Sequence, residues 1–135
     1  MRYLVDGYNL FFRVWRETSP FQKELERFIK DLDYEIGLLG LEVVLVLDSC
    51  RDRAEVFPSS KKLEALKVLF SPKELCADSY ILELLSWESH LTTLVTSDKD
   101  LALKARRIGV QTQSSEEFAL FLSKKTWKNG RRRDR

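Results

Sequence analysis

The chain has 135 residues, of which 44% are hydrophobic and 33% charged, and this length and composition are typical of one folded domain. It contains no run of about 18 apolar residues, and Asp6 interrupts the apolar start of the chain, so the sequence predicts neither a membrane helix nor a secretory signal. The two cysteines, Cys50 and Cys76, lack metal-type spacing, and we expect reduced thiols in a cytoplasmic protein.

The first predicted elements are a strand and a long helix. Residues 3–5 form a short apolar run that stops at Asp6 and Gly7, which is typical of a buried strand entering a turn. Apolar residues then recur at helical spacing up to residue 39. Ser19 suits the N-cap of this helix, Pro20 its first turn and Gly40 its exit.

A second strand is predicted at residues 43–47, which are apolar without any polar alternation. Such a strand is covered on both faces, as in a parallel sheet between two layers of helices. The strand stops at Asp48. Beyond it we expect a loop at residues 50–58, a short helix at 59–67 and a third strand at 68–70.

The second half of the chain continues the alternation of helices and strands. We expect a helix opening at residues 77–78, a strand at 91–96 that leads to Asp98, a helix ending near Gly109, and a short strand at 110–112. Ser114 and Glu117 have the spacing of a capping box that starts a final helix. The pattern predicts an α/β domain over residues 1–123, a three-layer α/β/α sandwich with a mainly parallel sheet.

Charge is distributed unevenly along the chain. Residues 124–135 hold seven basic residues and one acidic residue, a net charge of +6, whereas the remaining 123 residues hold 16 basic and 20 acidic residues, a net charge of −4. We interpret residues 124–135 as a basic tail. An acidic body with a basic tail suits a protein that contacts a polyanion such as RNA, although a solvated tail without a partner gives the same pattern.

Aspartates follow three of the predicted strands. Asp6, Asp48 and Asp98 close these strands, and ligands of a parallel sheet bind beyond the carboxyl ends of its strands. Asp78 opens a helix and Asp100 lies two residues beyond Asp98. Clustered carboxylates repel one another, and a cation removes that cost. A set of oxygen ligands without histidine or cysteine favours Mg²⁺ or Mn²⁺.

Each of these aspartates alone has a simpler explanation, because Asp98 and Asp78 are also suitable helix N-caps. Other chemistries have less support. His90 is the only histidine, which excludes a two-histidine ribonuclease mechanism, and the chain has no glycine-rich phosphate loop. We expect Trp15, Trp87 and Trp127 in or beside the core, with Trp127 also able to stack on a base.

Four motifs follow one another along the chain: residues 6–10 (DGYNL), 47–48 (LD), 77–81 (ADSYI) and 95–101 (VTSDKDL). Together they resemble the YacP-like branch of NYN domains, within the PIN-like nuclease superfamily. The resemblance extends from residue 1 to about residue 122. It implies a PIN-like fold and a metal-dependent endoribonuclease whose products carry 5′-phosphate and 3′-hydroxyl ends, and some members of the branch act on mRNA at the ribosome.

The resemblance also implies roles for individual residues. Asp6, Asp78 and Asp98 would form the acidic centre, with Asn9 at its rim and Asp48 as a further member. In the mechanism that we expect, Asp48 or Asp100 could hold outer-shell waters. Thr96 and Ser97 would shape the turn that presents Asp98. The basic residues expected to guide the RNA backbone are Arg13, Arg16, Lys99, Lys124, Lys125, Lys128, Arg131, Arg132 and Arg133. Arg106 and Arg107 are further candidates, but a solvated helix face near the helix C-terminus is the slightly better explanation for them.

Three other interpretations remain open from the sequence. The same fold could bind RNA or a ribosome without cleaving it. A receiver-like or phosphatase-like protein also gathers aspartates at strand ends, but Asp6 is followed by Gly7 and Tyr8 rather than by a second aspartate. A PIN-type toxin would share the site, and its neighbouring inhibitor gene would distinguish it.

Overall fold

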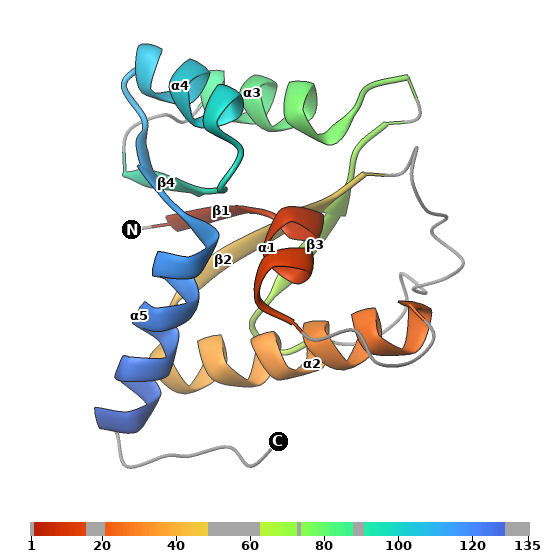
Figure 1. Cartoon of the computed structure of the whole chain (residues 1–135), viewed down its shortest axis with the longest axis vertical. Helices are drawn as coiled ribbons and strands as arrows, with labels where there is room; N and C mark the ends of the chain where they lie inside the picture. Colours follow the sequence, from red (N-terminus) through yellow and green to blue (C-terminus); the bar gives the residue numbers. More distant parts are fainter. Residues whose placement is uncertain (1, 16–20, 49–62, 73, 88–90, 129–135) are drawn as a thin grey trace.

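The computed structural model describes residues 2–15, 21–48, 63–72, 74–87 and 91–128. In this part of the chain, five strands form one parallel sheet in the order β3-β2-β1-β4-β5 (Figure 1). The strands are β1 (Arg2–Asp6), β2 (Glu42–Leu47), β3 (Lys67–Phe70), β4 (Thr92–Val95) and β5 (Gln111–Gln113).

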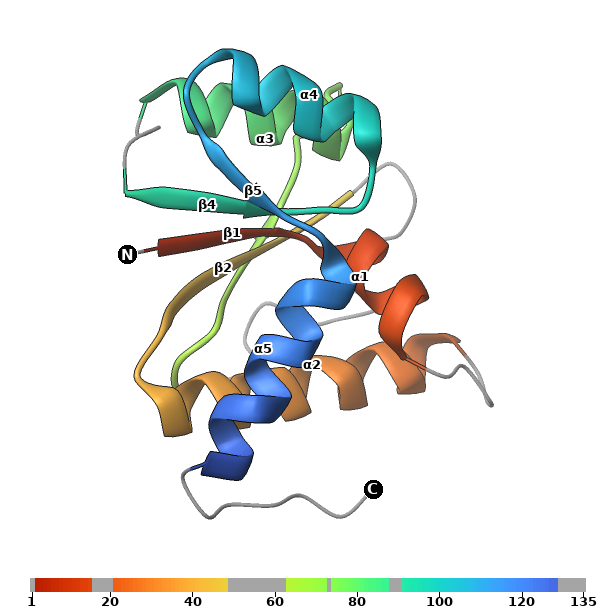
Figure 2. The same ribbon diagram turned by 60° about the vertical axis from the view of Figure 1, so that its left-hand side comes forward.

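Helices cover both faces of this sheet. The helices are α1 (Gly7–Val14), α2 (Phe21–Leu39), α3 (Ala77–Trp87), α4 (Lys99–Arg107) and α5 (Ser115–Lys128). Figures 1 and 2 show α1, α2 and α5 on one face and α3 with α4 on the other. The predicted three-layer α/β/α sandwich is therefore confirmed.

Strand β2 shows why the layers form. Its alternate residues Val43, Leu45 and Leu47 enter the core beneath α1, α2 and α5, whereas Val44 and Val46 enter the core beneath α3 and α4. All five side chains are buried. An apolar strand without polar alternation has a buried partner on each face, as the sequence predicted.

The structure differs from the prediction in two elements, one predicted helix and one helix that was not predicted. Residues 63–66 are not helical, and the predicted helix at 59–67 is wrong over this described part. The carboxylate of Asp33 accepts hydrogen bonds from the backbone N–H groups of Glu64, Ala65 and Leu66, at 3.1, 2.7 and 2.7 Å, and these bonds replace helical ones. Helix α1 was not predicted at all, because it starts directly after β1 where we expected only a turn.

Three further expectations concern ends and boundaries. Gly40 and Gly109 both have positive φ, +66° and +87°, as expected for glycines that end helices. The expected N-cap and first-turn residues Ser19 and Pro20, and the loop at residues 50–58, lie outside the described residues. Helix α5 continues to Lys128, so the first part of the predicted basic tail is helical.

The tryptophans differ from one another. Trp15 packs against the core, and its indole N–H donates to the buried carboxylate of Glu24 at 2.7 Å, which confirms its boundary position. Trp87 is 79% exposed, so the expectation of a core or boundary residue is wrong there. It is the last residue of α3, beyond the buried residues of that helix. The side chain of Trp127 lies outside the described residues.

Within the described helices, none is long and apolar enough to cross a membrane.

Candidate active site

The sheet order places the predicted aspartates at one edge. Strands β2 and β3 lie on one side of β1, and β4 and β5 on the other, so the chain reverses its direction of winding between β1 and β4. In open parallel sheets, ligands bind at the carboxyl ends of the strands beside such a switch point. Asp6 ends β1 and Asp98 follows β4, one on each side of it. We call the group Asp6, Asp48, Asp78, Asp98 and Asp100 the acidic edge.

Asp6 is the buried member of the acidic edge, with 8% of its surface exposed. Burial raises the pKa of its carboxyl group to about 6, and the charges of Asp78 and Asp98 act in the same direction. A hydrogen bond from Thr96 and the nearby backbone N–H of Asn9 favour the charged form but do not cancel this effect. Asp6 occupies the N-cap position of α1, yet its side chain makes no full capping hydrogen bond. Helix capping is therefore a weak explanation for this aspartate.

Gly7 lets helix α1 begin against the sheet. A methyl group at this position would lie 2.6 Å from Cδ2 of Leu47 and 2.8 Å from the carbonyl oxygen of Val46. No side chain fits without moving the backbone of β2. Glycine is thus sterically required after Asp6, because it allows the first turn of α1, which carries Asn9, to lie close against β2.

Thr96 links the two aspartates on either side of the switch point. Its buried hydroxyl donates to Oδ2 of Asp6 at 3.0 Å and accepts from the backbone N–H of Asp98 at 3.1 Å. Its own backbone N–H donates to the carbonyl of Gln113 at 2.9 Å. One side chain therefore contacts both the Asp6 carboxylate and the backbone at Asp98.

Asp98 combines a structural role with a place in the acidic edge. It is the N-cap of α4, and its Oδ1 accepts from the backbone N–H groups of Asp100 and Leu101 at 3.0 and 3.2 Å. Capping holds the carboxylate in place but does not remove it from the acidic edge, because its charge raises the pKa of both Asp6 and Asp78.

Asp78 joins the same electrostatic group from the first turn of α3. Partial burial raises the pKa of its carboxyl group, and the charges of Asp98, Asp100 and Asp48 add to that rise, while Lys104 opposes it. Asp100 is exposed and pairs with Lys104 at 3.1 Å. The five predicted aspartates therefore belong to one electrostatic group, although they come from four separate parts of the chain.

The donor chemistry of the acidic edge fits a hard divalent cation, because every candidate ligand is a carboxylate oxygen and the buried one is poorly compensated. The geometry is less complete. Over the residues that the structure describes, no three Asp, Glu, His or Cys side chains lie close enough together to hold a metal ion as they stand.

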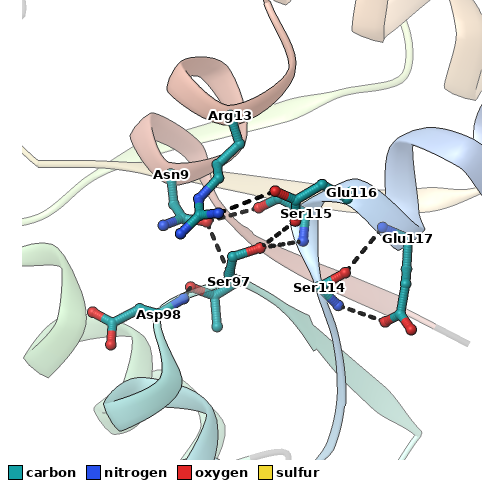
Figure 3. Close-up of polar contacts among 9 residues, drawn as sticks. Asn9, Arg13, Ser97, Asp98, Ser114, Ser115, Glu116 and Glu117 are labelled. Atoms are coloured by element: carbon teal, nitrogen blue, oxygen red, sulfur yellow. Dashed lines mark hydrogen bonds and ion pairs between the residues drawn. The ribbon is translucent and has the colours of Figure 1, made fainter.

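Asn9 does not point its side-chain oxygen at the acidic edge. Its Oδ1 accepts from the backbone N–H of Ser97 at 2.8 Å and from the hydroxyl of Ser115 at 2.7 Å (Figure 3). Ser97 in turn donates its hydroxyl to Glu116 at 2.7 Å. The sequence analysis gave Ser115 and Glu116 no role at the candidate site. A sequence feature that could have pointed to Glu116 is its place beside Glu117, because the capping box uses only Glu117 and leaves Glu116 without a role in it.

The predicted RNA-contacting residues that the structure describes lie on three different helices, α1, α4 and α5. Arg13 forms an ion pair with Glu116 at 3.1 Å, and Lys99 is exposed in the first turn of α4. Lys124 is exposed near the end of α5, about 14 Å along the helix from Ser115 at 1.5 Å per residue. Arg106 donates to the hydroxyl of Thr112 at 2.8 Å, and Arg107 is exposed. The side chains of Arg16, Lys125, Lys128, Arg131, Arg132 and Arg133 lie outside the described residues.

The sequence profile of the YacP-like NYN domain matches residues 3–133. The chain belongs to the YacP-like NYN domain family. NYN domains are generally nuclease-like, and the resemblance found in the four motifs is thereby confirmed at the level of the family.

Solved structures agree with this NYN fold. The crystal structure of Rae1 (YacP) from Bacillus subtilis is similar to this chain with a TM-score of 0.74 at 19% identity, covering 96% of this chain and 78% of that one. The W164L mutant of the same protein gives a TM-score of 0.72 at 18% identity, covering 94% and 77%. At these identities the likeness concerns the fold. None of the curated proteins matches the chain significantly by sequence.

Proposed function

We propose that this NYN domain is an endoribonuclease that depends on a divalent cation, Mg²⁺ or Mn²⁺, and hydrolyses RNA phosphodiester bonds at the acidic edge. The observation that carries the proposal is the state of Asp6. Its carboxylate is buried at the switch point of the sheet, and its pKa is raised to about 6 by burial and by Asp78 and Asp98. A carboxylate group of this kind costs stability, and such perturbed groups are concentrated at functional sites.

Asp6, Asp78 and Asp98 are the residues that would hold the cation, with Asp48 and Asp100 at its periphery. A bound cation supplies a more acidic water molecule and offsets the negative charge that develops on the phosphate during hydrolysis. The chain itself orients the carboxylates. Thr96 fixes Asp6, and the α4 backbone fixes Asp98 through its capping hydrogen bonds.

Basic residues around the acidic edge would guide the phosphate backbone. Lys99 and Lys104 lie on α4, the helix that Asp98 caps, and Lys104 already reduces the negative potential at Asp78. The basic tail would contribute general affinity for RNA rather than guide the phosphate backbone at the acidic edge, because its first residues form the last part of α5, remote from the first turn of that helix.

A cleavage assay on a mixed RNA pool, with Mn²⁺ or with chelator, tests the proposal. We expect cleavage only with the cation, with 5′-phosphate and 3′-hydroxyl products, and no cleavage by Asp6→Asn. This substitution removes a charge but little volume, and circular dichroism would check that the fold is kept. Equal cleavage by the variant and the unaltered protein would refute the assignment.

A second candidate is an RNA- or ribosome-binding module without turnover. The absence of a close group of three metal-ligating side chains in the described ranges favours it. RNA binding that persists without cleavage in either Mg²⁺ or Mn²⁺ would support this alternative.

The proposed endoribonuclease function includes action on mRNA at the ribosome, in the cytoplasm. Co-sedimentation of the protein with ribosomes would test this part.

A further inference from the structure

We propose that Ser115 and Glu116, in the first turn of α5, are positioning residues that hold the turn presenting Asp98. The proposal rests on the proposed function, because it assigns these residues to the same acidic edge. Neither residue belongs to the aspartate group. Both act through Ser97, which lies directly before Asp98 in the chain.

Ser97 is held by two different helices of the fold. Its backbone N–H donates to Asn9 of α1 at 2.8 Å, its hydroxyl donates to Oε1 of Glu116 of α5 at 2.7 Å, and the same hydroxyl accepts from the backbone N–H of Ser115 at 3.0 Å. The hydroxyl of Ser115 closes the ring by donating to Asn9 at 2.7 Å. Figure 3 shows these side chains converging on Ser97, while the carboxylate of Asp98 points away from them.

Burial and charge indicate that this ring is well ordered. Ser115 has no exposed surface. Glu116 is exposed, but its hydrogen bond from Ser97 and its ion pair with Arg13 lower the pKa of its carboxyl group, so the acceptor stays charged. A charged acceptor gives the stronger type of hydrogen bond to a hydroxyl.

Helix capping does not account for these contacts. The capping box of α5 is made by the neighbouring residues: Ser114 accepts from the backbone N–H of Glu117 at 3.0 Å, and Glu117 accepts from the backbone N–H of Ser114 at 2.9 Å. Glu116 is left to bind side chains of other elements. The two adjacent glutamates therefore have different tasks, one within α5 and one across to the Ser97 turn.

The matched pair Glu116→Ala and Glu117→Ala tests this assignment. Each removes one exposed carboxylate from the same helical turn. For Glu116→Ala we expect kcat with Mn²⁺ to fall roughly tenfold, the lower end for loss of a residue that orients a metal ligand, with little change in KM. For Glu117→Ala we expect kcat to stay within about twofold of the unaltered value, since the capping box holds no metal ligand. Glu116→Gln keeps an oxygen that accepts from Ser97 and should recover most of kcat.

A double-mutant cycle shows whether Glu116 acts through Ser97. Ser97→Ala with Glu116→Ala should lose no more kcat than the larger single loss, because both remove the same hydrogen bond. Additive losses, or equal effects of Glu116→Ala and Glu117→Ala, would overturn the proposal.

Binding of Mn²⁺ alone, measured by calorimetry, separates this proposal from the proposed function. If the unaltered protein cleaves no RNA, the nuclease assignment fails. The positioning role is then still supported if Glu116→Ala weakens Mn²⁺ binding several-fold relative to Glu117→Ala, and it is overturned if the two variants bind Mn²⁺ equally.

Discussion

Replacing Asp6 with asparagine should stabilise the cation-free protein at neutral pH. The pKa of the Asp6 carboxyl group rises from 3.8 to about 6 in the folded protein. At about 1.36 kcal/mol per pH unit, ionising this group in the folded state costs about 3 kcal/mol. An asparagine carries no charge to bury and keeps an oxygen that can accept from Thr96, so we expect a gain of about 1 to 3 kcal/mol at pH ~8.

The sign of the pH dependence follows from proton binding. The folded protein holds the Asp6 proton more tightly than the unfolded chain does. The contribution of this group to stability is therefore fully present below about pH 4, and it is lost as the pH rises through about 6. The advantage of Asp6→Asn should accordingly disappear near pH 4.

Urea denaturation in chelator at pH ~4 and pH ~8 measures both effects. Asp100→Asn is a suitable control, because Asp100 is exposed and its loss should change stability little. Adding Mn²⁺ at the higher pH should stabilise the unaltered protein and leave Asp6→Asn nearly unchanged. If Asp6→Asn were destabilised equally at both pH values, the claim that Asp6 is held at an electrostatic cost would be refuted.

Three further predictions concern other parts of the molecule. Gly7→Ala should destabilise the fold by about 1 to 3 kcal/mol, measured by urea denaturation, because its methyl group would collide with β2. Asp33→Ala should cost about 2 to 4 kcal/mol in the same assay, because three backbone N–H groups lose their acceptor; a change below about 0.5 kcal/mol would contradict this. Replacing residues 131–133 by glutamine should reduce the slope of log affinity for single-stranded RNA against log salt by about 2, with kcat unchanged, and an identical slope would show a passive tail.

Much of the fold could be predicted because its signals are local. The apolar run of β2 and the capping box of α5 both depend on neighbouring residues, and both were confirmed. The aspartates at strand ends followed from the rule that parallel strands share a carboxyl edge, and the structure places them in one electrostatic group. Whether they hold a cation stays a prediction.

The errors arose where distant residues decide the local structure. The segment before β3 is not helical because Asp33, more than 30 residues away, binds its backbone. The ring around Ser97 joins residues that are 18 to 106 positions apart, such as Ser115 with Ser97 and Ser115 with Asn9. Periodicity and capping patterns carry no information about such pairs. These pairs depend on how α1 and α5 pack beside the Ser97 turn in the folded chain.

The position of α5 near the end of the sequence has a consequence for biosynthesis. β1 lies at the centre of the sheet and is made first, but its neighbour β4 and the first turn of α5 are made only after most of the domain. The aspartate that ends β1 therefore gains its partners Thr96 and Asp98 only after β4 and the turn that follows it have been made. The acidic edge of a chain that is still being translated is therefore incomplete until late in synthesis.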